Sequence, residues 1–368
     1  MKKLLLLSCL LLSALWGQAQ ENKGKFRHLD LALTAGSTGI GFDLAVPAGE
    51  FCRLRAGATF MPHFEYKMQF GVELLGNHLG PSTPSATGQT QAEINHERFE
   101  HLRDMLQGFT GNEISEYVHM LGKPTFNNFK FLVDLYPFDN KHIHGTVGFY
   151  AGGGRVAQAY NTYESHVSLF SVKMYNDMYW RCRNNEPIIE DFEFDPYIRN
   201  RFLEYGSMAM TVGYFKEDYY AKQDILWDHN VYMDDMDENS PTYLETVLVH
   251  AKGDVMYHEG ELAYRKGDPY RMLPDRDNMV RVDAYVNKIR PYLGVGYQGA
   301  ITKDQRTQVS VDAGVMLWGG VPRVVTHDGI DLTHDLTQLN GHVERYVNIA
   351  SKMRCWPVLE LRLSHRIF

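Results

Sequence analysis

The chain has 368 residues, of which 44% are hydrophobic and 22% charged, and its formal net charge is −8. This acidic balance argues against nucleic acid as a partner. After Trp16 no apolar run reaches the ~18 residues that indicate a spanning helix, which excludes a helical membrane protein. A membrane β-barrel is not excluded, because its strands are only half apolar.

The first 19 residues have the pattern of a secretory signal peptide. Lys2 and Lys3 precede an apolar core from Leu4 to Trp16, and small residues follow at 17–19, where a signal peptidase cleaves. This core is shorter than the ~20 residues of a spanning helix. We therefore expect residues 1–19 to be removed on export.

The first predicted strands form a hairpin. Apolar residues occupy alternate positions from Leu29 to Ala35, and the apolar phase then moves to even-numbered positions from Ile40 to Val46. Residues 36–39, which include two glycines, separate these runs, and such a phase change is typical of a hairpin turn.

Six further segments alternate in the same way, which is the pattern of strands with two different faces. They cover residues 52–60, 129–136, 142–149, 289–297, 308–317 and 359–367. Together with the first hairpin they supply strands of roughly the 9–11 residues that cross a membrane. We predict an all-β fold, an antiparallel membrane-spanning β-barrel of about eight strands.

The connections between these strands are of two kinds. Those at 36–39, 47–51, 138–141 and 299–306 are short, whereas the insertions 63–126, 153–288 and 318–356 are long. If the first strand starts on the periplasmic side, all three long insertions fall on the outer side, as is typical of outer-membrane barrels. We therefore predict one barrel domain over residues 20–368, located in the outer membrane.

The long insertions carry patterns of their own. Apolar residues near helical spacing predict a helix within 93–109 and a clearer one within 333–352. We recognise no internal repeat. The acidic run 234–238 lacks the central glycine and ligand spacing of an EF-hand loop, so a solvated outer loop is favoured over a calcium site.

Alternation alone does not decide which face is inside, because a soluble barrel turns its apolar face inward and a membrane barrel turns it outward. The polar faces carry charges of both signs, which a narrow barrel can pair in its lumen. We expect Arg53 and Arg55 to lie near Asp43, and Arg290 near Asp312. The predicted polar lumen comprises Asp43, Arg53, Arg55, Lys130, Asp134, Arg290, Asp312, Glu360 and Arg362, and the predicted lipid-facing set includes Leu54, Ala56, Phe131, Val133, Val311, Ala313 and Leu361.

Several strand segments are similar to those of a known family. They are STGIGFDLAVPAG (37–49), FKFLVDLYPFDN (129–140), IRPYLGVGY (289–297), VSVDAGVMLWGGVP (309–322) and WPVLELRLSHRIF (356–368). The chain resembles bacterial outer-membrane β-barrel proteins without assigned activity, which occur in Bacteroidetes and, in shorter form, in proteobacteria. The resemblance covers about a third of the chain, at the strands, and implies the fold and the location but no activity.

No residue pattern assigns a reaction. His142 and His144 share a strand face and could bind a transition metal, but no third ligand is identifiable, so we expect no metal and no cofactor. Ser364 and His365 are strand neighbours on opposite faces and cannot form a catalytic pair. We expect no enzyme but a structural or surface-interaction role, with a narrow transport channel and then a lipid-modifying enzyme as alternatives. The expected partners are outer-membrane lipid and, during insertion, the barrel assembly machinery.

Overall fold

The protein is described here by a computed structural model. The described residues are 28–70, 100, 103–104, 107–108, 111, 113, 118–138, 141–187, 195–207, 210–236, 240–242, 246–275, 277–339 and 341–367. The predicted signal peptide, the apolar residues of the 93–109 stripe and Phe368 lie outside these ranges. Within them, the helices all fall short of the length or the hydrophobicity needed to cross a membrane.

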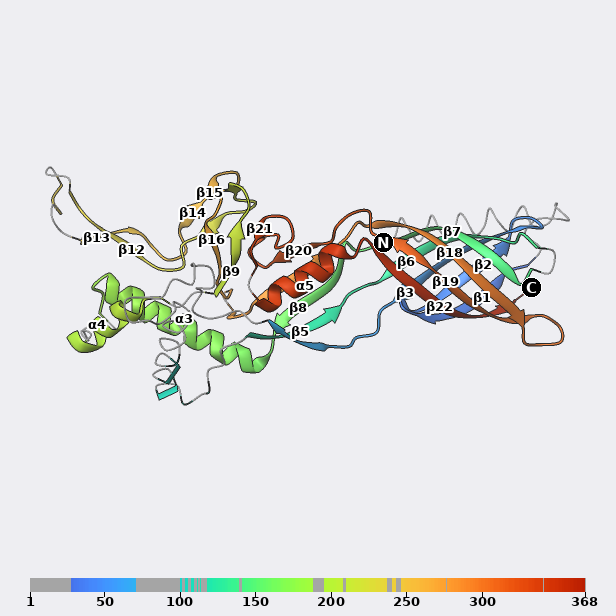
Figure 1. The fold of residues 1–368 in the computed structure, drawn as a ribbon, viewed down its shortest axis with the longest axis horizontal. Helices are drawn as coiled ribbons and strands as arrows, with labels where there is room; N and C mark the ends of the chain where they lie inside the picture. The colour runs from blue at the N-terminus through green and yellow to red at the C-terminus, as the bar shows by residue number, and fades with distance from the viewer. Residues whose placement is uncertain are drawn as a thin grey trace, which may run out of the picture.

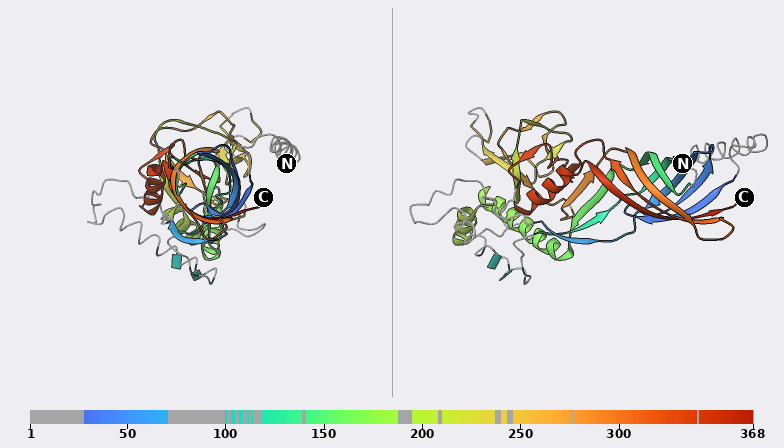
Figure 2. Two further views of the ribbon diagram at one scale, coloured as in Figure 1. Left: turned by 90° about the vertical axis from the view of Figure 1, so that its right-hand side faces the viewer. Right: turned by 45° about the vertical axis from the view of Figure 1, so that its right-hand side comes forward.

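Eight antiparallel strands close into a barrel, as predicted (Figure 1). Viewed from its end, the barrel forms a continuous ring (Figure 2, left). The last strand pairs with both the first and the seventh, which closes the wall. In barrel order the strands are β1 (Asp30–Gly36), β2 (Gly39–Pro47), β3 (Cys52–Phe60), β6 (Asn128–Leu135), β7 (Ile143–Gly152), β18 (Ile289–Ala300), β19 (Thr307–Leu317) and β22 (Cys355–Arg366).

The strands alternate between exposed apolar and buried polar or small residues. In β18, Ile289 and Leu293 are exposed, whereas Arg290 between them is buried. The facing predicted from the alternation is observed in the structure: Phe131, Val311 and Leu361 point outward, and the charged side chains of the same strands are buried. This barrel has an apolar outer wall and a charged interior.

A second sheet extends the wall at one end of the barrel. Its strand order, β4-β5-β8-β17-β20, repeats the barrel order β3-β6-β7-β18-β19, so each strand continues a barrel strand next to it in the chain. Helix α5 (Gly341–Lys352) contacts both edge strands, β4 and β20. The sheet strands are β4 (Tyr66–Phe70), β5 (Val118–Pro124), β8 (Arg155–Asn161), β17 (Arg281–Tyr285) and β20 (Arg323–Thr326).

Beyond this sheet, the chain between α4 and β17 folds back on itself as a ladder of strand pairs. The pairs are nested, because the first strand pairs with the last and the innermost strands pair with each other. β21 (Leu336–Thr337) joins the outermost pair. The pairs are β9 (Met210–Phe215) with β16 (Pro269–Met272), β10 (Tyr219–Tyr220) with β15 (Leu262–Tyr264), β11 (Ile225–Leu226) with β14 (Val255–Tyr257), and β12 (Val231–Asp234) with β13 (Thr246–His250).

The ladder contains a repeat that the sequence analysis missed. Gly253, Gly260 and Gly267 recur every seven residues, and each has a positive φ of 97°, 89° and 88°. Each glycine donates its backbone N–H to a carbonyl across the ladder: Gly253 to Trp227, Gly260 to Ala221 and Gly267 to Phe215. The next residue, Asp254, Glu261 or Asp268, accepts a backbone N–H three residues back. The missing signal was this Gly-acid spacing, which alternation does not detect.

Two helices pack beside the ladder. α3 (Tyr163–Arg183) begins at Thr162, whose hydroxyl accepts the N–H of Ser165, and α4 (Pro196–Tyr205) begins at Asp195 with proline in its first turn. The predicted 333–352 helix is shorter than expected: it starts at Gly341, because residues 336–337 pair with β9 instead. An apolar core joins α3, α4, α5, the ladder and the extension sheet. All these elements lie at one end of the barrel (Figures 1 and 2).

Candidate functional site

Arg55 occupies the centre of the barrel lumen. Its side chain is 1% exposed, and its guanidinium nitrogens lie near four carboxylates from four other strands. The distances are 3.0 Å to Asp134, 3.4 Å to Asp312, 3.8 Å to Asp43 and 3.9 Å to Glu360. A buried charge is tolerated only when it is paired, so this arginine holds the acids of the lumen together.

Two further cations complete the charged layer. Lys130 Nζ lies 2.9 Å from Asp43 and 2.7 Å from Glu360. Arg362 lies 3.5 Å from Asp134 and 3.6 Å from Asp312. The result is an interlinked layer of buried charges rather than a set of separate pairs.

The layer also includes a histidine that the sequence analysis considered only as a metal ligand. His144 Nε2 lies 2.6 Å from Asp312 Oδ1, and the ring is fully buried. His142, which was expected to share its face, is exposed and stacks on Tyr297 with ring centroids 5.7 Å apart. The described residues contain no group of three side chains that could hold a metal ion.

Two glycines in the wall make room for these charges. A Cβ at Gly296 would lie 2.2 Å from Asp312 Oδ1 and 2.4 Å from His144 Nε2. A Cβ at Gly57 would lie 2.2 Å from Asp43 Oδ1. Glycine within a strand often marks such a close approach, and this signal was present in the alternation of β3 and β18.

At the short-turn end of the lumen, one expected pairing is wrong. Arg53 pairs with Asp30 at 2.8 Å and not with Asp43. The register explains this, because Asp43 lies opposite Gly57, whereas Arg53 lies opposite Pro47 near the turn. Asp30, at the start of β1, was missed because the alternation was followed only through its apolar residues.

At the opposite end, the expected pair of Arg290 with Asp312 is also wrong. Asp312 lies opposite Gly296, six residues from Arg290 along β18, which is about 20 Å at ~3.4 Å per residue. Arg290 instead donates to Asn128 Oδ1 and to the carbonyls of Gly153 and Asn287. Its guanidinium also lies over the ring of Phe126, 5.1 Å from the centroid.

On the side of the charged layer that lies toward the extension sheet, the lumen is filled by an apolar layer that the sequence analysis did not predict. Tyr150 and Tyr292 meet edge to face at 5.4 Å, and Phe126 lies 5.8 Å from Trp356. Tyr150 lies on β7, Tyr292 on β18 and Trp356 on β22, and Phe126 precedes β6. The buried members of the apolar layer are Phe126, Leu132, Tyr150, Val156, Tyr292, Met316 and Val358.

The weaker candidate sites do not assemble. Ser364 is buried on the inner face, whereas His365 is exposed and bonded to Thr307 Oγ1 at 3.0 Å. They therefore point to opposite faces, as predicted. In the acidic run, Asp234 and Asp235 accept hydrogen bonds from Thr246 and Thr242, and residues 237–238 lie outside the described residues.

No protein-family model and no curated protein matches the chain. Solved structures similar to it include CarO2 of Acinetobacter baumannii, which is 11% identical with a TM-score of 0.34 and is covered over 92% of this chain and 98% of its own. CarO of the same organism is 10% identical with a TM-score of 0.33, over 92% and 97%. A major outer membrane protein from Thermus thermophilus is 11% identical with a TM-score of 0.24, over 94% and 100%.

These scores are too low to carry an argument, and the barrel's own geometry decides its location. Leu33, Phe129, Leu293 and Val295 are each about 60% exposed on the outer wall, while the lumen charges are buried. A closed barrel with an apolar exterior satisfies its backbone in lipid, and barrels of this kind span bacterial outer membranes. The protein is an outer-membrane β-barrel.

Proposed function

We propose that the protein is a non-conducting outer-membrane barrel that presents a folded outer region for interaction at the cell surface. The observation that carries the proposal is the filled lumen, in which the Arg55 charge layer and the Tyr150–Tyr292 apolar layer follow one another along the axis. Eight-stranded barrels have an interior just wide enough for side chains, which agrees with this filling.

The second half of the proposal is supported by the outer region, the name used here for the extension sheet, the ladder and helices α3, α4 and α5. It has its own apolar core, which includes Tyr175 of α3, Phe215 of β9 and Val347 of α5. A protein that only fills the lumen of a membrane barrel does not require a second apolar core. An ordered region at one rim of the barrel is what a surface-interaction protein requires.

Conductance tests the first half. The purified protein, inserted in a planar bilayer beside a known porin as positive control, is expected to show no steady ion current. A reproducible current with the size of a hydrated pore contradicts the filled lumen and supports the alternative of a narrow channel.

Cysteine labelling on intact cells tests the second half. Met233→Cys places a thiol in the exposed part of the ladder, and Lys303→Cys places one in the short turn at the other end of the barrel. With a membrane-impermeant maleimide, the first variant is expected to label and the matched control is not, above the background of the unmodified protein. The reverse pattern places the ladder in the periplasm and overturns surface display.

A further inference from the structure

The face of the extension sheet that lies toward α5 carries glycine, alanine and proline at most positions of its central strands. The register aligns Tyr66, Gly122, Ala159 and Val282 in one cross-strand row. The next row is Pro124, Ala157, Ala284 and Val324. Residues that face each other across strands share a side of the sheet, so these rows form one surface.

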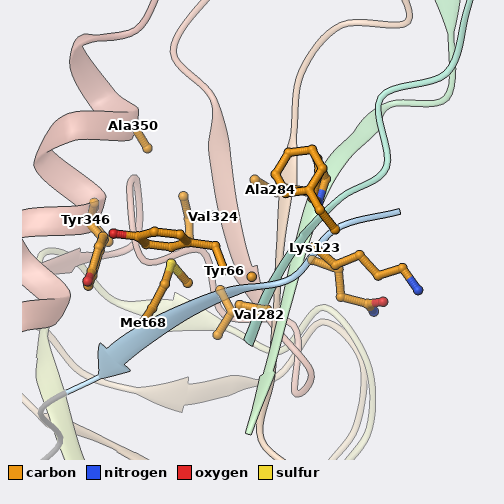
Figure 3. A pocket seen from close by; sticks show the side chains of 15 residues that line it. Tyr66, Met68, Lys123, Val282, Ala284, Val324, Tyr346 and Ala350 are labelled. Atoms are coloured by element: carbon orange, nitrogen blue, oxygen red, sulfur yellow. The ribbon is translucent and has the colours of Figure 1, made fainter. Parts of the chain in front are cut away.

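Helix α5 packs over this face of the sheet but leaves a space between them. An apolar cavity of about 310 Å³ lies between the sheet and the helix. Tyr346 and Ala350 of α5 lie on one side and Met68 and Val282 on the sheet side (Figure 3). Ala284 lines the cavity and also packs against the apolar layer, so the cavity lies at the mouth of the barrel. Barrel mouths and apolar cavities of this size are common ligand sites.

The rim of the cavity carries exposed aromatic side chains. Phe64 is 54% exposed and Tyr66 is 66% exposed, and both line the cavity. An apolar compartment with an aromatic rim suits a hydrocarbon chain that enters from one end.

A polar cavity of about 610 Å³ adjoins the apolar one, and the two share Met68 and Tyr346 as lining residues. The side chains of Lys67 and Arg345 form no ion pair and no hydrogen bond with any residue that the structure describes. Thr162, at the N-terminus of α3, brings the positive end of the helix dipole to the same cavity. The other lining residues are His119 and one acid, Glu164.

We propose that the two cavities together bind an anionic amphiphile with a single alkyl chain. The chain lies in the apolar cavity under α5. The carboxylate or phosphate head reaches past Met68 and Tyr346, round the edge strand β4, into the polar cavity near Lys67 and Arg345, because Lys67 alternates with Met68 and points to the other face of β4. Each methylene that leaves water contributes to affinity, and the two basic side chains select the sign of the head. This site is separate from the filled lumen and stands whether or not the barrel conducts.

The test uses the full-length protein in phosphatidylcholine nanodiscs, which avoids competition from detergent. A fluorescent long-chain fatty acid is expected to bind saturably. A lysophosphatidic acid that displaces it extends the site to phosphate heads, and one that does not restricts the site to carboxylates. An alkyl trimethylammonium of equal chain length is expected to compete about tenfold less well, the scale of one charged contact. Equal competition by the cationic amphiphile overturns the proposal.

Substitutions locate the binding. Ala157→Phe fills the apolar cavity and is expected to abolish binding. Arg345→Glu changes an exposed side chain and is expected to weaken binding of the anionic amphiphile about tenfold. Lys352→Glu is the matched control, because this exposed residue lies on the same helix and lines neither cavity.

Two outcomes contradict the site. Unchanged binding in a folded Ala157→Phe variant shows that the alkyl chain does not occupy the apolar cavity. Equal affinities of Arg345→Glu and Lys352→Glu show that the head does not lie in the polar cavity. If Ala157→Phe fails to fold, the exposed Arg345→Glu change still decides the proposal, with heat-modifiable gel mobility as the folding check.

Discussion

The barrel and the outer region use alternating strands with opposite facing. In the barrel, Leu293 and Leu361 face outward and the charges of the same strands face inward. In the outer region, Val118 and Met120 of β5 are buried on either side of the half-buried His119 and face an apolar core. The comparison shows that alternation specifies a two-faced sheet, and that the surrounding medium decides which face is inside.

The two regions also differ in how they use charge. The barrel's ion pairs are buried, as with Lys130 and Glu360, whose side chains are 0% and 3% exposed. The outer pairs are open to solvent, as with Lys252 and Asp177, at 47% and 41%. Buried pairs are costly to break and exposed pairs contribute little, so the two regions should respond very differently to substitution.

The largest expected effect comes from removing the central cation of the barrel. Arg55→Met leaves four carboxylates with too few partners and should destabilise the barrel by about 3–5 kcal/mol. Urea unfolding of the protein in detergent micelles measures this. Arg306→Met, an exposed arginine 3.9 Å from Asp304, is the control and should have little effect. Similar losses for both variants contradict the charge layer as the barrel's main constraint.

A smaller effect is expected where the wall approaches the charges. Gly296→Ala puts a methyl group against Asp312 and His144 and should cost about 1–3 kcal/mol by overpacking. Gly299→Ala, on the same strand, meets no atom within 4 Å and should be nearly neutral. The same unfolding measurement compares them. Equal stability of the two variants contradicts the claim that Asp312 and His144 leave no room for a side chain at position 296.

In the outer region, the expected cost is local. Gly260→Ala forces an alanine to a φ of 89° in the ladder and should cost about 1–2 kcal/mol. Limited proteolysis should cut the ladder faster, while heat-modifiable mobility of the barrel stays unchanged. Gly320→Ala, where φ is not positive and no atom lies within 4 Å, is the control. A simultaneous loss of barrel stability would show that the two regions unfold as one unit.

The smallest expected effect is a pH dependence of the outer region. Burial raises the pKa of Asp275, but hydrogen bonds from Arg281 and from the backbone of Met279 and Asp277 outweigh it, and the pKa is lowered. A carboxyl with a lowered pKa stabilises the fold above its unfolded value of about 3.9, and this contribution is lost as the pH falls through the folded value.

Protease resistance of the outer region should therefore decrease between pH 7 and pH 3. Asp275→Asn should reduce the loss of unfolding free energy between these pH values by about 1 kcal/mol or less, because the Arg281 partner is half exposed. An unchanged pH profile in the variant removes Asp275 as a contributor.

Sequence reasoning worked best where one rule governs a long segment. The eight barrel strands, their short turns and the side of most of their residues follow from a period of two, because successive side chains in a strand point to opposite faces. The strands of the ladder were not predicted from alternation, since β10 and β11 have only two residues each and too few positions to show any period. Its signal lay in the spacing of Gly253, Gly260 and Gly267.

The amino-acid sequence by itself determined that Arg55, Asp134 and Asp312 lie on polar strand faces, and that the barrel closes with eight strands. Only the tertiary structure decided which charges meet. Arg53 and Arg290 keep their predicted face but pair with partners other than those expected, because register and strand tilt set the height of each residue along the lumen. The cavity under α5 likewise depends on residues from strands far apart in the chain, which no local pattern brings together.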